Sequence, residues 1–173
     1  MGFLFSMILV PARIAGAYVA QEMGLTMATI TDPVSQQPAS VLAHLFEAFA
    51  VLLFLGLDVH HMLLLSMNAT FHFWAIGTPI SDSAIALAVS GVGDAHRWAL
   101  MIAAPIGISL FLTTIILLLL NRASPQLNLF SVGIVVRVAV GIGSLLIFLP
   151  SIVSSIHRFF ANTTGTISHF FHL

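Results

Sequence analysis

The sequence feature that most constrains this chain is the length of its apolar runs. Residues 98–120 form 23 consecutive positions without a charged side chain. An α-helix of that length spans about 35 Å, which exceeds the hydrocarbon core of a bilayer at about 30 Å. Because the run is continuous rather than alternating, it predicts a membrane-spanning helix and not a strand of a β-barrel.

The composition of the whole chain agrees with an all-α integral membrane protein. Of its 173 residues, 59% are hydrophobic and 6% are charged, whereas a soluble domain carries about 25% charged residues. So few charges cannot cover a water-exposed surface, and in lipid the backbone must satisfy its own hydrogen bonds. We therefore expect a multi-pass helical protein in contact with membrane lipid.

Charge and residue types argue against several functional classes. The net charge of −1 gives no electrostatic support for a nucleic-acid partner. The absence of cysteine excludes disulfides and thiolate metal sites. The sequence contains no nucleophile–base arrangement and no glycine-rich phosphate loop. We therefore expect no enzymatic activity, no cofactor and no metal site.

The chain is predicted to form a single membrane domain over residues 1–173, with about four long, kinked hydrophobic helices. The first helix covers residues 1–23, and Gly24 is suited to cap its C-terminal end. A long loop follows over residues 24–40. This loop contains no lysine or arginine.

The remaining segments are predicted from the same apolar pattern. A long second helical region covers residues 41–76, in which Gly56 marks a kink. A polar connection runs from Gly77 to His96. The last two helices form a C-terminal hairpin over residues 98–156, and Pro105 is expected to bend the first of them.

The second helical region carries a polar stripe. On a helix with 3.6 residues per turn, its polar side chains fall close to one line. Because a charge at mid-membrane costs about 2.5 to 3.5 kcal/mol, this stripe should face protein or water rather than lipid. The stripe consists of Ser40, His44, Glu47, Asp58, His61, Asn68 and His72.

Three interpretations of the polar stripe are open. In the first, Glu47, Asp58 and His61 form a proton relay. In the second, His44 and Glu47 bind a metal, although their order reverses the Glu-x-x-His pattern of helical metal sites. In the third, the stripe is a polar seam that packs against other subunits or lines an aqueous path. His60 cannot share this line with its neighbour His61, so it is expected to mark an interface or a helix break.

A single arginine interrupts the last apolar helix. Gly133, Arg137 and Gly141 are spaced four residues apart and therefore share one helix face. Small residues on a helix face allow another helix to approach closely. We expect Arg137 to point at protein, where an acid or backbone carbonyls pair with it. A snorkelling arginine that faces lipid is the alternative.

The order of several motifs resembles one known family. The chain contains, in order, "GLTMATITDP", "PASVLAHLFEAFAVLLFLGLDVHHMLLLSMNATFHFWAIG", "LLNRASPQLNLFSVGI" and "VAVGIGSLLIFLP". This run resembles the FliR family of export-gate subunits, which serve flagellar and virulence-type (SctT-like) type III secretion. Two departures are visible: Glu22 stands where glutamine is usual, and Asp58-Val59 replaces a common Asn-Gly or Asp-Gly pair. The usual further N-terminal helices are also lacking.

The resemblance implies a role in protein export. In these gates one FliR-like subunit joins several copies of FliP and FliQ around a central pore in the bacterial inner membrane. The loop from Gly24 to Ala39 is similar to the segment that plugs this pore. A closure that opens for an unfolded polypeptide should be deformable, as the flexible methionine side chain is, and should not bind charged residues tightly. The plug residues expected from this resemblance are Gly24, Met27, Thr29, Asp32 and Pro33.

The last two helices look like the FliQ-type hairpin of the same family. We therefore predict a non-enzymatic, pore-forming subunit of a protein-export gate, at the flagellar basal body or in a related secretion system. The alternative is a small proton-coupled transporter or channel that uses the acidic and histidine residues of the polar stripe. The motif "NRASPQL" marks the hairpin turn at Asn121, Arg122, Pro125 and Gln126.

Overall fold

The computed structural model describes residues 2–25, 41–73, 82–123 and 129–171, and this part of the chain contains no strand. The expected all-α class is therefore confirmed. The described residues form five helices, which are α1 (Gly2–Glu22), α2 (Val41–Gly56), α3 (Val59–Phe73), α4 (Asp82–Ala123) and α5 (Leu129–Phe171).

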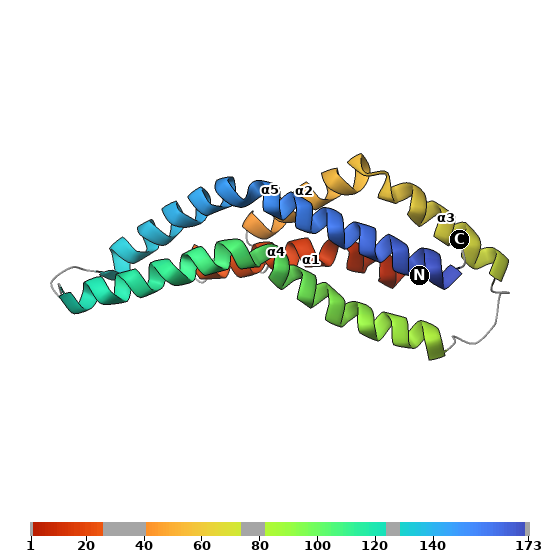
Figure 1. Ribbon diagram of the computed structural model, residues 1–173, viewed down its shortest axis with the longest axis horizontal. Coiled ribbons are helices and arrows are strands. Elements are labelled where there is room, and N and C mark those ends of the chain that lie inside the picture. Colours follow the sequence, from red (N-terminus) through yellow and green to blue (C-terminus); the bar gives the residue numbers. More distant parts are fainter. Residues whose placement is uncertain (1, 26–40, 74–81, 124–128, 172–173) are drawn as a thin grey trace, which may run out of the picture.

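The helices form an elongated arrangement organised around α1 and the long pair α4 and α5 (Figure 1). The most extensive packing joins α1 to α4, α4 to α5 and α1 to α2. α4 and α5 run antiparallel, and the end of α4 lies near the start of α5. α3 packs on α5 rather than on α1 or α4, so it lies against the C-terminal part of the molecule (Figure 1).

Two of these helices are long and apolar enough to cross a membrane. They are the parts of α4 and α5 at Ala88–Ala123 and Val132–Gly165, each with a mean hydropathy of 2.4. If the bent pair formed by α2 and α3 acts as one broken span, the described residues contain three. The sequence therefore folds into the multi-pass helical protein that its composition predicts.

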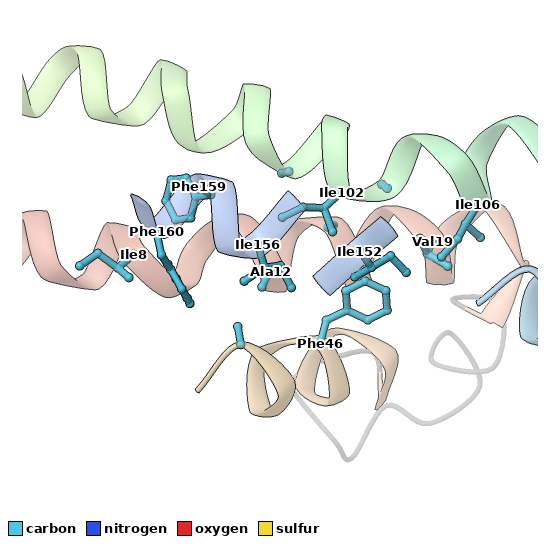
Figure 2. Packing of buried hydrophobic residues seen from close by; sticks show 14 of the residues in the cluster. Ile8, Ala12, Val19, Phe46, Ile102, Ile106, Ile152, Ile156, Phe159 and Phe160 are labelled. Atoms are coloured by element: carbon cyan, nitrogen blue, oxygen red, sulfur yellow. The ribbon is translucent and has the colours of Figure 1, made fainter. Parts of the chain in front are cut away.

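A hydrophobic core forms where α1, α2, α4 and α5 meet (Figure 2). Side chains on one face of each helix recur at helical spacing, so that a single apolar stripe from each helix reaches the same core. Large aromatic and β-branched residues fill the space between the helices, and small residues on α1 let its neighbours approach. The labelled core residues are Ile8, Ala12, Val19, Phe46, Ile102, Ile106, Ile152, Ile156, Phe159 and Phe160.

The backbones of α1 and α2 approach closely at Gly16 of α1. A methyl group added at Gly16 would lie 2.8 Å from the Cα atom of Ala43 and 2.8 Å from the carbonyl oxygen of Leu42. Both atoms belong to the backbone of α2, so neither can move aside as a flexible side chain could. Ala12 and Ala20 continue the buried small face one turn on either side, as in small-xxx-small contacts between membrane helices.

The second helical region contains two helices where the sequence predicts one kinked helix. α2 ends at Gly56, α3 begins at Val59, and their axes differ by 74°. Gly56 weakens the helix because glycine has a poor helix propensity. Asp58 then adopts a left-handed conformation with φ of 56°, which no helix can continue through. The expected kink is therefore a full break at Leu57 and Asp58.

The predicted limits of the last two helices were too narrow. α4 begins at Asp82, so residues 82–96, expected to be a polar connection, are helical. Their many alanine, leucine and isoleucine residues outweigh Gly91 and Gly93, each of which costs about 1 kcal/mol relative to alanine. α5 likewise continues to Phe171, beyond the expected end at residue 156.

Replacing Gly16 with alanine should destabilise the protein because the added methyl group meets the backbone of α2. We expect a loss of about 1 to 3 kcal/mol, as is typical for overpacking. The matched control is Gly93→Ala on α4, where an added methyl group has nothing within 4 Å. That change should stabilise by up to about 1 kcal/mol.

Thermal unfolding in detergent, followed by circular dichroism, measures both effects. The midpoint should fall for Gly16→Ala and hold or rise for Gly93→Ala. A rise in both variants would contradict the close approach of α1 and α2.

Candidate functional site

The polar stripe of the second helical region divides into two clusters. In the first, a Glu47 carboxylate oxygen (Oε2) lies 3.8 Å from Nε of Arg13 and 3.7 Å from Nδ1 of His44. Glu47 is partly buried, whereas the side chains of Arg13 and His44 are more than half exposed. Arg13 belongs to α1, and it reaches Glu47 because Gly16, one turn further along, holds α1 close to α2.

The second cluster lies at the break between α2 and α3. Oδ1 of Asp58 is 3.5 Å from Nδ1 of His61 and 3.9 Å from Nε2 of His60. The predicted role of His60 as the mark of a helix break agrees with this position. Among the described residues, these three side chains are the ones grouped closely enough to hold a metal ion.

The two clusters do not form one continuous line. Glu47 lies on α2, and Asp58, His60 and His61 lie beyond or within the 74° bend. No ion pair connects the clusters within the part of the chain that the structure describes. The straight helical stripe assumed from the sequence is therefore interrupted, because a single helical register ends where the helix breaks.

Arg137 lies on a face of α5 that packs against two other helices. A methyl group at Gly133 would lie 3.8 Å from Cδ1 of Leu117 on α4, and one at Gly141 would lie 2.7 Å from the side chain of Met23. Between these contacts, Nε of Arg137 is buried without a hydrogen-bond partner. An unsatisfied polar group in such a place costs about 1 to 3 kcal/mol, and among the described residues Nε of Arg137 has no partner.

The residues at the start of the predicted plug loop, Met23 and Gly24, contact the helical core. Gly24 has φ of +78°, and its N–H donates to the carbonyl oxygen of Gln21 at 3.0 Å. This confirms the expected C-terminal cap of α1, because the left-handed conformation suits glycine. Met23, just before it, is buried against α5. The other predicted plug residues, Met27, Thr29, Asp32 and Pro33, lie outside the described residues.

The predicted hairpin turn is described on one side only. Asn121 and Arg122 lie in the last turn of α4 and are exposed, where a basic residue complements the helix dipole. Pro125 and Gln126 lie outside the described residues. The hairpin helices are joined further along by Oγ of Ser109 and Oγ of Ser144, which are 2.7 Å apart. The sequence analysis missed this contact, since serines in apolar helices gave no signal of which helix they face.

A second contact missed from the sequence joins α1 to α4. The hydroxyl of Tyr18 lies 2.8 Å from Nε2 of His96. Tyr18 also lines an open, mostly apolar groove of about 470 Å³ between the two helices, together with Glu22, Gly107 and Phe111. Tyr18 is the one tyrosine in the chain, a signal that could have marked it as a polar contact within an apolar helix.

Comparison with known proteins places the chain in a family. A model of the family described as "Bacterial export proteins, family 1" matches residues 1–163. The chain is 34% identical over 153 residues to the flagellar biosynthetic protein FliR of Escherichia coli (strain K12), which covers 88% of this chain and 59% of that protein. It is 36% identical over 142 residues to FliR of Pectobacterium carotovorum subsp. carotovorum, covering 81% and 54%.

A more distant relative extends the match along the chain. FliR of Bacillus subtilis (strain 168) is 26% identical over 171 residues, which covers 96% of this chain and 66% of that protein. The chain thus spans between 54% and 66% of the length of these relatives. The family match covers all of α1 to α4 and α5 as far as residue 163, and therefore nearly all of both helices of membrane length. The chain belongs to the FliR family of bacterial export proteins.

Proposed function

We propose that this chain is a pore-forming part of a flagellar-type protein-export gate in the bacterial inner membrane and catalyses no reaction. The observation that carries this proposal is the family match over residues 1–163, with relatives named for flagellar biosynthesis. The distribution of apolar surface supports it. In the most apolar stretches of α4 and α5, 28% and 17% of the residues are buried, so most of both helices is available to lipid or to other subunits.

The partners that we propose are FliP-like and FliQ-like subunits, as the resemblance to the family implies. Arg137 supports a protein partner rather than lipid alone. Its Nε is buried without a hydrogen-bond partner, and glycines on either side bring α4 and α1 close to it. A helix of another subunit that supplies a carboxylate or free carbonyls would satisfy this group, which lipid tails cannot do.

The alternative of a proton-coupled transporter has less support. It requires Glu47, Asp58 and His61 to follow one another along one path, and the bend between α2 and α3 separates the first from the other two. Arg13 of α1 stands 3.8 Å from the carboxylate of Glu47, so this carboxylate faces a neighbouring helix rather than the cluster at Asp58.

The closure that we propose for the pore is the loop from Gly24 to Ala39. Two described features support this assignment. The loop leaves α1 at a left-handed glycine, which turns the chain sharply out of the helix axis. Met23 immediately before it is fixed against Gly141 of α5, so the loop departs from a packed anchor.

The function is tested first by assembly. When expressed alone, the chain should be less stable in detergent than in the complex and should aggregate at high concentration, because its exposed apolar faces and Arg137 lack their partners. Co-expression with the FliP-like and FliQ-like proteins of the same organism should yield a large complex that co-purifies. Native gel or native mass spectrometry of the detergent extract measures this. A stable, monodisperse monomer that binds neither protein would contradict the gate assignment.

The role of Arg137 is tested by comparing the effect of one substitution on the isolated chain with its effect on the complex. In the isolated chain, Arg137→Leu should leave the thermal midpoint unchanged or raise it, because it removes a buried polar group without a partner at Nε. In the complex, the same change should lower the yield, because a partner group loses its cation, at a cost of about 3 to 5 kcal/mol. Arg158→Leu is the matched control, since Arg158 on the same helix is exposed.

The comparison needs both measurements on both variants. Arg158→Leu should change neither the thermal midpoint nor the yield of complex. Equal yields of complex for the two leucine variants would refute a partner at Arg137.

The loop is tested in a gate that is otherwise competent to assemble. Deleting residues 27–30 or introducing Met27→Asp should leave assembly intact and make the membrane leak ions, because a charge in a neutral seal must stay hydrated. Shortening a connecting loop by four residues costs little conformational free energy, provided that the loop still spans the two helix ends. Met27→Leu is the control and should remain tight. If the deletion and the aspartate variant assemble normally and are as ion-tight as the parent, the loop is a connector and not the closure.

A further inference from the structure

The break between α2 and α3 gathers three potential metal ligands that the export function leaves unexplained. Asp58, His60 and His61 each offer one ligand atom, and these atoms all lie within 4.8 Å of one another. The two imidazole rings stand side by side with centroids 4.3 Å apart. From the sequence, the one metal interpretation named His44 and Glu47 and no metal site was expected at Asp58, His60 and His61.

Both distances from the Asp58 carboxylate to an imidazole are longer than a hydrogen bond and close to the spacing of two ligands on one ion. Oδ1 of Asp58 is 3.5 Å from Nδ1 of His61 and 3.9 Å from Nε2 of His60. Hydrogen bonds between such atoms are about 2.7 to 3.2 Å long. Two ligand atoms on one tetrahedral ion are about 3.4 Å apart when each bond is about 2.1 Å. Small movements of these side chains would therefore place one ion among all three atoms.

The backbone at Asp58 holds the carboxylate at this position. Its φ of 56° lies in the left-handed region, which aspartate tolerates better than most residues do. The carbonyl oxygen of Asp58 accepts a hydrogen bond from the N–H of His61 at 3.0 Å. This turn brings residue 58 back beside the first turn of α3, where His60 and His61 lie. The conformation that breaks the helix is thus the one that assembles the cluster.

His60 presents a single nitrogen to the cluster. Its Nδ1 is buried without a hydrogen-bond partner, and its ring packs near Phe54 with a centroid distance of 6.4 Å. Nε2 is the nitrogen that lies towards Asp58. Packing near Phe54 therefore leaves Nε2 as the nitrogen of His60 that is available to a ligand.

A neighbouring cavity leaves room for further ligands. Asp58 lines a space of about 200 Å³ between the helix break and α5, and His157 of α5 lines it as well. A cavity of this size holds several water molecules, each of which occupies about 30 Å³. Water can therefore complete the coordination of an ion at Asp58, and His157 of α5 offers a further nitrogen donor in the wall of the same cavity.

We propose that Asp58, His60 and His61 bind one divalent transition-metal ion of the zinc type, with water completing the coordination. Two imidazole nitrogens and one carboxylate oxygen suit zinc and its neighbours, whereas magnesium and calcium take oxygen ligands. The other histidine–carboxylate pair does not qualify, because the Glu47 carboxylate beside His44 already faces the guanidinium of Arg13. An ion at the break would hold α2 and α3 at their bend.

The test uses the full chain, purified in detergent without a histidine tag. Calorimetric titration with Zn²⁺ should give one equivalent of saturable binding, and Co²⁺ should produce visible absorption bands of a nitrogen- and oxygen-ligated ion. Asp58→Asn and His61→Gln should each weaken Zn²⁺ binding by more than about tenfold. Both changes are conservative: asparagine also tolerates the left-handed conformation, and the His61 side chain is 67% exposed.

His44→Ala is the matched control, because it removes a histidine from the other histidine–carboxylate pair. It should leave Zn²⁺ affinity and the Co²⁺ spectrum unchanged. The proposal is overturned if the unaltered chain shows no saturable one-equivalent binding, whatever the variants do. It is also overturned if Asp58→Asn and His61→Gln keep full affinity, or if His44→Ala weakens binding as much as they do. Circular dichroism of each variant confirms that its helices are retained.

Discussion

The packing of α2 against the small-residue face of α1 is the contact on which the rest of this structure depends. Gly16 allows the backbones of the two helices to meet, and buried alanines extend the same face along α1. α1 also packs on α4 and reaches α5, so it joins α2 to the long helical pair. In lipid, where apolar side chains gain little by leaving one apolar phase for another, such close van der Waals contact is a main source of helix association.

The polar contacts of the fold follow from this packing. Arg13 meets Glu47, Tyr18 meets His96, and Ser109 meets Ser144, and each contact joins two different helices. In an apolar environment a polar group without a partner is costly, so each pair favours one register of its two helices over others. On α5, in contrast, the buried Nε of Arg137 has no hydrogen-bond partner among the described residues. For this reason a partner subunit, rather than lipid alone, is proposed for that face.

The two histidine–carboxylate clusters differ in what neutralises the carboxylate. At Glu47 an arginine from another helix supplies a permanent cation. At Asp58 the ion-pair neighbours are two imidazoles, gathered by a break in the helix. The first arrangement stabilises helix packing, while the second leaves a carboxylate and two nitrogens spaced around a common point. Similar residue types thus serve different purposes because the backbone places them differently.

The sequence by itself determined the class of the protein. Long uncharged runs and a charged fraction of 6% require membrane helices, and the ordered motifs identify the family that the comparison supports. It also located the cap at Gly24, because a glycine just past an apolar helix has a local conformational reason to be there. These features depend on the total composition or on residues that are adjacent in the sequence, so the sequence alone is enough to predict them.

Only the tertiary structure decided which polar groups meet. The stripe of residues 40–72 was derived from an unbroken helical period, and one left-handed residue at position 58 ended that period. Arg13 could not be assigned to Glu47, nor Tyr18 to His96, because such pairs depend on how two separate helices approach. The start of α4 was likewise misjudged, since two glycines and two aspartates were taken as a connection although the alanines among them favour a helix. Local rules fix which segments are helical, whereas the meeting of distant side chains is set by packing that no single segment encodes.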